Sequence, residues 1–316
     1  MASVEETLAW EAEWRPRAVA AALVAALAGT AGGVMLALLE HRGPAEEDGF
    51  VSLPEALGVT AAGREPGEPS LLVRLIDYRG DKLGLFILSA VLTILGAVGA
   101  LMALTYLFRA ARARNPEIGR AVGWSIAAAL ALYPLGRGLR EIATSIEYSQ
   151  FADAAERTPG AVRDIPSEGV LPAAALIEIL GQFALALAFV LVSLNAMRVG
   201  LLTRFMGILG VIVGALTVFQ LDAPQVVRGL WLAFLGALVA GRYPGGTPPA
   251  WLTGRAEPWP TQQELRERRD ALRAEHREDA EADTDEDTVA VPAQAPRPGD
   301  PDYVPGAARR KRKKRK

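Results

Sequence analysis

The chain has 316 residues, a formal net charge of −2, no cysteine and only two histidines. The lack of cysteine excludes disulfides, thiolate metal sites, iron–sulfur clusters and palmitoylation. His41 and His276 lie at the end of the first apolar segment and in the C-terminal tail, so neither can serve a nucleophile or a zinc ion deep in a bilayer. We therefore expect neither intramembrane serine-protease nor zinc-protease chemistry.

Six long apolar segments dominate the first three quarters of the chain. A hydrocarbon core of about 30 Å requires about 20 apolar residues in helical form. The sequence therefore predicts an all-α fold, a polytopic membrane helix bundle of about six transmembrane helices within residues 1–244 and a C-terminal tail outside the membrane. The spans are expected at residues 17–39, 83–108, 121–142, 172–197, 201–221 and 225–241.

The first span is expected to be a retained helix. Glutamates precede Arg15 and Arg17, so the early basic region of a secretory signal is missing. Trp10 and Trp14 stand where interfacial aromatic residues anchor a helix. In the loop that follows, apolar residues at helical spacing after Leu71 predict a short helix on the membrane surface.

The arginines near the span ends predict the orientation. The connector after the second span is rich in arginine between Arg109 and Arg120, which is typical of a cytoplasmic loop. Together with the loop from Arg198 to Arg204, it favours both termini on the cytoplasmic side of a plasma membrane. An even number of spans requires the termini to share a side.

A polar cluster is predicted where the third and fourth spans meet. The sequence Tyr133-Pro134-Leu135-Gly136 is expected to kink the third span, because proline lacks an amide hydrogen. Antiparallel packing would bring an arginine of the third span beside a glutamate of the fourth, and intramembrane charges usually pair. The candidate residues are Arg137, Arg140, Glu141, Glu178 and Gln182.

Two interpretations of this cluster stay open. The favoured one is a structural ion pair of Arg137 or Arg140 with Glu178, which locks two helices together. The other is an anion-binding pocket, in which a helix that restarts after Pro134 presents free amides beside the two arginines.

Other polar and small residues predict helix packing. Asn195, Thr217 and Gln220 are expected to hydrogen-bond between helices, and the alternative is that they line a narrow polar path. Gly29-x-x-x-Gly33 and Gly210-x-x-x-Gly214 permit close approach of helix backbones, within one chain or in a dimer.

Two further positions are interpreted from their place at the start of a span. Pro172 is expected in the first turn of the fourth span, where its missing amide hydrogen is tolerated. Arg228, near the start of the sixth span, is expected to extend outward to the interface.

Residues 245–316 predict a cytoplasmic tail of three parts. A proline-rich linker comes first, then a charged helix from Glu264 to about Ala282 with a capping box begun by Thr261. After Asp283 the composition cannot bury enough apolar surface to order the chain, which predicts disorder.

The last eight residues are all basic and are candidates for contact with anionic lipid headgroups. A solubilising role that also enforces orientation is the alternative interpretation, and nucleic acid is disfavoured because no aromatic or folded reader accompanies the run. The eight residues are Arg309, Arg310, Lys311, Arg312, Lys313, Lys314, Arg315 and Lys316.

No catalytic motif is present: the chain has no H-E-x-x-H, no G-x-S-x-G and no P-loop. Asp81 lies before the second span, too shallow for an intramembrane aspartyl pair. We expect no catalytic, cofactor or metal site.

The expected function is that of a non-enzymatic scaffold or sensor with an unknown protein partner. The alternative is a small oligomeric transporter or channel that uses Arg137, Arg140 and Glu178.

Two segments carry a resemblance. The end of the second span, from Tyr106 to Arg114, and the segment Gly241-Arg242-Tyr243-Pro244-Gly245-Gly246 resemble uncharacterised multi-spanning integral membrane proteins of high-GC bacteria. The resemblance implies a helical membrane fold and brings no known activity with it.

Overall fold

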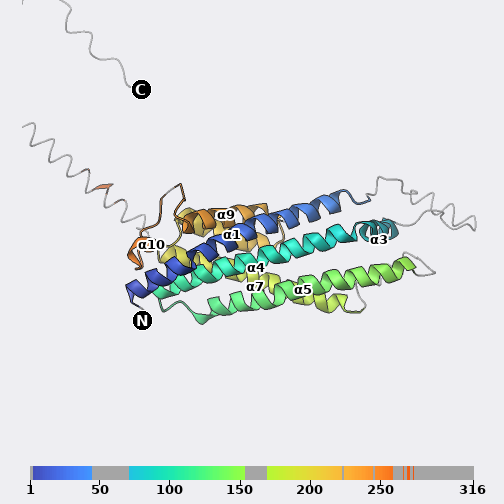
Figure 1. Cartoon of the computed structure of the whole chain (residues 1–316), viewed down its shortest axis with the longest axis horizontal. Coiled ribbons are helices and arrows are strands. Elements are labelled where there is room, and N and C mark those ends of the chain that lie inside the picture. Colours follow the sequence, from blue (N-terminus) through green and yellow to red (C-terminus); the bar gives the residue numbers. More distant parts are fainter. Residues whose placement is uncertain are drawn as a thin grey trace, which may run out of the picture. The chain divides into compact units, whose positions relative to one another are not determined.

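The computed structural model describes residues 3–44, 71–153, 169–222, 224–244 and 246–258, and in addition four residues between 266 and 273. The chain divides into two compact units, Met1–Trp259 and Pro260–Lys316. Within the described residues every element is a helix. The helices of the first unit are α1 (Val4–His41), α3 (Leu71–Asp81), α4 (Leu83–Arg114), α5 (Arg120–Asp153), α7 (Leu171–Arg198), α8 (Arg204–Val218), α9 (Val226–Val239) and α10 (Ala250–Thr253) (Figure 1).

Helix α1 begins well before the predicted first span at residue 17. Its start is fixed by a capping box, in which the Glu6 amide donates to the Ser3 hydroxyl at 3.1 Å and the Ser3 amide donates to the Glu6 carboxylate at 2.8 Å. The 38 residues of α1 extend about 57 Å at 1.5 Å per residue. The first helix therefore exceeds the thickness of a hydrocarbon core, and its amino-terminal end carries polar residues beyond it.

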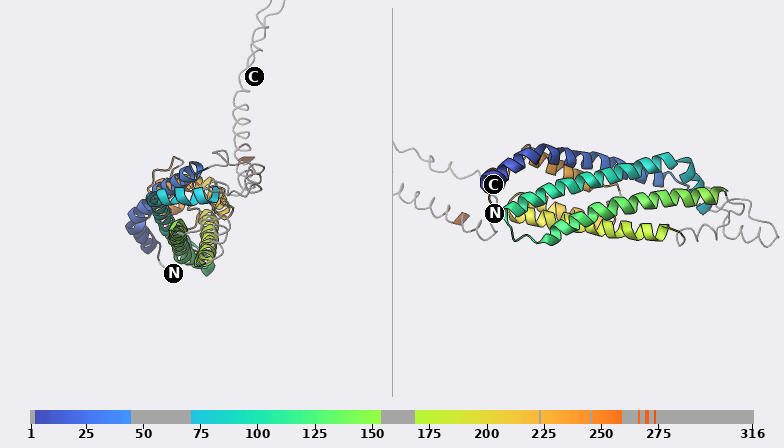
Figure 2. Two further views of the ribbon diagram at one scale, coloured as in Figure 1. Left: turned by 90° about the vertical axis from the view of Figure 1, so that its right-hand side faces the viewer. Right: turned by 60° about the horizontal axis from the view of Figure 1, so that its bottom comes forward.

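The long helices of the first unit lie side by side (Figures 1 and 2). Helix α1 packs along α4 and α9, α5 packs along α7, and α7 also packs along α8. Helix α4 contacts both α5 and α7 and so joins the two groups. Helices α1 and α9 are neighbours although they lie far apart in the sequence, and their contact closes the bundle.

Small residues allow α1 and α4 to approach closely. A Cβ atom added at Gly96 of α4 would lie 2.5 Å from the Cα atom of Gly29 on α1. Gly210 and Gly214 of α8 likewise face Ser193 and Val190 of α7. Gly29, Gly210 and Gly214 of the predicted glycine pairs thus contribute to packing within the chain, as small residues do between helices in lipid.

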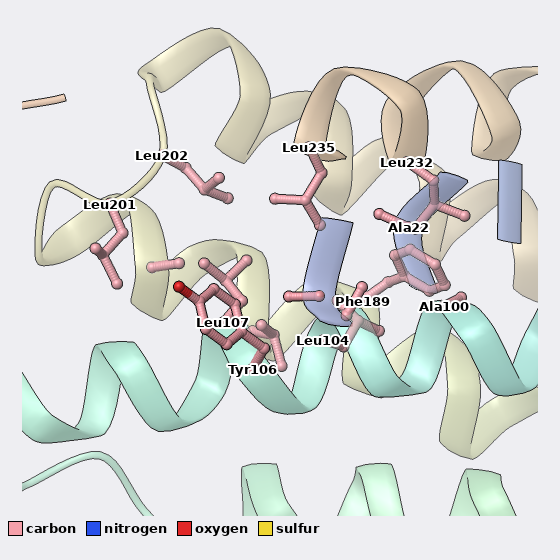
Figure 3. Packing of buried hydrophobic residues seen from close by; sticks show 14 of the residues in the cluster. Ala22, Ala100, Leu104, Tyr106, Leu107, Phe189, Leu201, Leu202, Leu232 and Leu235 are labelled. Atoms are coloured by element: carbon pink, nitrogen blue, oxygen red, sulfur yellow. The ribbon is translucent and has the colours of Figure 1, made fainter. Parts of the chain in front are cut away.

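The largest buried cluster joins residues of α1, α4, α7 and α9 around alanine and leucine side chains (Figure 3). Phe189 meets the Trp231 ring edge to face at a centroid distance of 5.4 Å. The Trp231 indole donates to the Met206 carbonyl at 2.9 Å, so its only polar atom is paired. The core is apolar where these helices meet.

Among the described residues, three helices are long and apolar enough to cross a membrane: α1, α4 and α7. Helices α8 and α9 are apolar but contain 15 and 14 residues, about 22 Å each, which is less than a hydrocarbon core. Helix α5 is long, but Arg137, Arg140 and Glu141 interrupt its apolar character. The structure thus identifies three candidate spans where the sequence predicts about six.

The end of the predicted linker is instead part of the bundle. The indole of Trp251, on α10, is buried and donates to the Leu201 carbonyl at 2.9 Å. The Glu257 amide donates to the Val199 carbonyl at 3.1 Å. The first compact unit thus extends to Trp259, 15 residues beyond the predicted end of the membrane domain at residue 244, because the buried Trp251 lies in a segment rich in proline and glycine.

The predicted short helix after Leu71 is present as α3. It packs against the bundle: Ile76 is buried, and the Tyr78 hydroxyl donates to the Leu39 carbonyl at the end of α1 at 3.0 Å. Helix α3 therefore contacts the neighbouring helices of the bundle.

In the second unit the four described residues are helical and exposed, and Arg273 lies 3.8 Å from Asp270. The predicted capping box at Thr261, the segment after Asp283 and the basic run from Arg309 to Lys316 lie outside the described residues.

Candidate functional site

Arg137 and Arg140 of α5 both contact Glu178 of α7. The nitrogen-to-oxygen distances are 3.5 Å from Arg137 and 3.0 Å from Arg140. The side chain of Arg137 is 13% exposed and that of Arg140 is 52% exposed. The expected ion pair between the two helices is therefore present, with two arginines sharing one carboxylate.

Glu141 is close to this group but has a different partner. It is buried, and the Arg79 guanidinium of α3 donates to it at 2.7 Å. Arg79 also stacks over the Phe86 ring at 4.3 Å. Arg79 was not among the predicted residues; its signal in the sequence was a charge on the apolar side of an amphipathic helix next to a span.

Gln182 does not join the charged group. Its amide donates to the Thr217 carbonyl at 2.8 Å, and its oxygen accepts from the Gln220 amide at 3.2 Å. These hydrogen bonds link α7 to α8 through Thr217 and to the turn after α8 through Gln220. Asn195 instead donates within its own helix, to the Leu191 carbonyl at 2.7 Å.

Two local predictions are corrected. Helix α5 continues through Pro134 to Asp153, so no helix restarts beside the arginines and no free amide end is available there. Arg228 does not extend outward. Its guanidinium donates to Gln225 at 3.1 Å and to the Thr217 hydroxyl at 3.2 Å, because the turn between α8 and α9 places acceptors within its reach.

A polar cavity of about 130 Å³ opens beside the ion pairs, room for about four waters. The guanidinium Nε atoms of Arg79 and Arg137 are buried there without a hydrogen-bond partner. The cavity is thus lined by charged groups that are only partly satisfied. Its lining residues are Leu36, Glu40, Arg79, Arg137, Arg140, Glu141, Thr144 and Tyr148.

Directly beside Glu178 the seam between α5 and α7 is closed by backbone contacts. A Cβ atom at Gly136 would lie 2.7 Å from the Ile177 carbonyl carbon, and one at Gly181 would lie 2.5 Å from the Cα atom of Tyr133. No side chain fits between the two helices at this point. The backbones of α5 and α7 are therefore in direct contact at these two glycines.

A second ion pair joins α1 and α4, near the start of α1 and the end of α4. Glu11 of α1 pairs with Arg114 of α4, and neither side chain is exposed. Arg114 also donates to the Ala250 carbonyl at 2.7 Å, while the Tyr106 hydroxyl donates to the Glu11 carbonyl at 3.3 Å. This pair, which the sequence reasoning missed, joins α1, α4 and α10.

Within the described residues no group of three histidine, aspartate or glutamate side chains is placed to hold a metal ion. No protein-family model matches the chain, and neither a curated protein nor a solved structure is detectably similar to it. Function is therefore inferred from the chain's own residues.

Replacing each arginine that pairs with Glu178 in turn should show which of the two contributes more to the stability of the protein. Arg140 lies closer to Glu178, but Arg137 is the more buried, and an ion pair shielded from water contributes more to stability than an exposed one. We expect Arg137→Gln to destabilise the protein more than Arg140→Gln, by about 1–3 kcal/mol, in detergent-denaturation measurements. Adding Glu178→Gln to Arg137→Gln should recover part of the loss. Equal, additive losses would contradict the pairing.

Proposed function

We propose that the protein is a non-enzymatic, multi-pass integral membrane protein of the plasma membrane that acts as a scaffold or a sensor. The closed seam beside Glu178 carries this proposal: the intramembrane charges are paired between helices whose backbones touch. Such an arrangement fixes helices relative to one another and leaves no path for a solute along that seam.

The contacts of Arg114 support an even number of crossings. Glu11, near the amino terminus, and Ala250, near the end of the first unit, both contact this one side chain. The two ends of the unit therefore lie at the same end of the bundle. With the arginine-rich connector between α4 and α5, this favours both termini in the cytoplasm, where the tail is available to a protein partner.

A small transporter or channel is the second candidate. The polar cavity at Arg137 and Arg140 favours it, because a solute site needs charged groups that are accessible and only partly paired. In that case the site would have to connect to the other end of the bundle in a second conformation.

Single cysteines distinguish the two candidates without background, because the native chain has no cysteine. Thr144, on α5, lines the polar cavity. Ala188, on α7 and ten residues after Glu178, is fully buried. We expect Thr144→Cys to react with a membrane-impermeant maleimide added to intact cells, and Ala188→Cys to stay unreactive.

Permeabilised cells provide the control for orientation, since Thr144→Cys should react there in either topology. Reaction of Thr144→Cys only after permeabilisation would reverse the proposed orientation. Reaction of Ala188→Cys from either side would reveal a water path and favour the transporter.

A further inference from the structure

A second cavity, of about 220 Å³, lies between α1 and α4, away from the polar cavity. We propose that it binds one anionic phospholipid, with the headgroup phosphate at Arg17 and Arg109. Its walls combine the two arginines with aromatic and aliphatic side chains, chiefly Trp10, Trp14, Met102 and Tyr106.

The position of the cavity along the helices matches a membrane interface. Arg17 and Arg109 each stand where a long apolar stretch ends, at the start of the first predicted span and the end of the second. Ala18 and Met102, on the apolar side of the two arginines, also line the cavity. An occupant therefore meets cationic groups at one end and apolar surface at the other, as a phospholipid requires.

The arginines are available to a headgroup. Arg17 lies over the Trp14 ring at 4.6 Å, and its one carboxylate neighbour, Glu13, is 3.9 Å away with both side chains largely exposed. Such an exposed pair contributes little and is readily exchanged for a phosphate. In the described part of the chain, the exposed Arg109 has no ion pair.

Stacked aromatic rings form one wall of the cavity. Trp10 stacks on Tyr106 at 5.5 Å, and Tyr106 stacks on Trp251 at 5.9 Å. The buried pair of Glu11 and Arg114 holds the same helices together beneath the rings. Aromatic side chains at this depth offer a rigid surface to the lipid's glycerol and upper acyl region. Basic pockets between membrane helices are known to take anionic headgroups.

Tryptophan fluorescence tests this site in the full-length protein. Dibrominated phosphatidylglycerol should quench the fluorescence more than dibrominated phosphatidylcholine with the same acyl chains, because Trp10 and Trp14 line the cavity. In Arg17→Gln/Arg109→Gln the lipid should bind roughly thirtyfold more weakly, and the excess quenching should disappear. Both side chains are exposed, so the double variant is expected to fold.

Arg242→Gln is the matched control, since Arg242 is also exposed but does not line the cavity. It should leave the phosphatidylglycerol excess unchanged. The basic run from Arg309 to Lys316 is present in every variant, and no tryptophan follows Trp259, so lipid held only by that run gives no difference between the variants.

Inorganic phosphate distinguishes a lipid from a free anion. At millimolar concentration it should not displace the brominated lipid. Displacement by phosphate would show a general anion site instead of a lipid site. Equal quenching by the two lipids, or an unchanged excess in the double variant, would overturn the proposal.

Discussion

Replacing Glu11 with glutamine is expected to lower the free energy of unfolding by about 3–5 kcal/mol, because it leaves the Arg114 guanidinium buried without a counter-charge. Both side chains of the pair are fully inaccessible. Denaturant titration of the purified protein in detergent, followed by tryptophan fluorescence, measures the change. Glu13→Gln is the control: this glutamate is two residues away, largely exposed and only loosely paired with Arg17 at 3.9 Å.

The double variant Glu11→Gln/Arg114→Met separates charge from packing. It should be more stable than Glu11→Gln alone, since no unpaired charge remains. It should not reach the stability of the native chain, because the hydrogen bonds from Arg114 to the Ala250 carbonyl are lost as well. If Glu11→Gln is as stable as Glu13→Gln, the pair does not hold the bundle together.

Adding methyl groups between α5 and α7 should be the other strongly destabilising change. Gly136→Ala/Gly181→Ala places two Cβ atoms within 2.7 Å of the opposing backbone, where no side chain can move aside. Overpacking at one site costs about 1–3 kcal/mol, so the double variant should lose about 2–6 kcal/mol in the same denaturant titration.

Gly84→Ala/Gly138→Ala is the matched control. Both glycines are helical, and an added Cβ atom meets nothing within 4 Å at Gly84 and only the Ile94 side chain at 4.0 Å at Gly138. Alanine is the better helix former, so the control should be as stable as the native chain or slightly more stable. Similar losses in both double variants would mean that contact with the opposing backbone is not the cause of the loss.

The sequence predicted the α5–α7 part of the candidate site because its geometry follows from two adjacent antiparallel helices. Depth along each span was enough to bring Arg137, Arg140 and Glu178 together. Arg79 could not be found in the same way, since it reaches Glu141 from α3, and the position of α3 beside α5 does not follow from the spacing of residues within the spans.

The buried pair of Glu11 and Arg114 escaped prediction for a related reason. Apolar length alone set the start of the first span at residue 17, which left Glu11 in water. In the structure α1 begins at Val4, and α10 covers the pair with Trp251 and the Ala250 carbonyl. A glutamate can be buried there because a partner 103 residues away neutralises it.

Helices α8 and α9 are shorter than the predicted fifth and sixth spans, and the backbone conformation of a few flanking residues explains the difference. Thr203 is extended and caps α8 through its hydroxyl, so the helix cannot start at residue 201. Gln220 and Gln225 have φ angles of 53° and 56°, which end α8 and delay α9. Hydrophobicity gave no sign of these turn residues, because it does not report backbone conformation.

The neighbourhood of Arg114 also sets an order of events during synthesis. Glu11 is made first, its counter-charge follows about a hundred residues later, and the Ala250 carbonyl that completes the shell of Arg114 arrives near the end of the unit. In a nascent chain that stops before α9 and α10, the side of α1 that packs on α9 has no partner, and Arg114 lacks its hydrogen bonds to the Ala250 carbonyl. The bundle can reach its final stability only when nearly the whole of the first unit has left the ribosome.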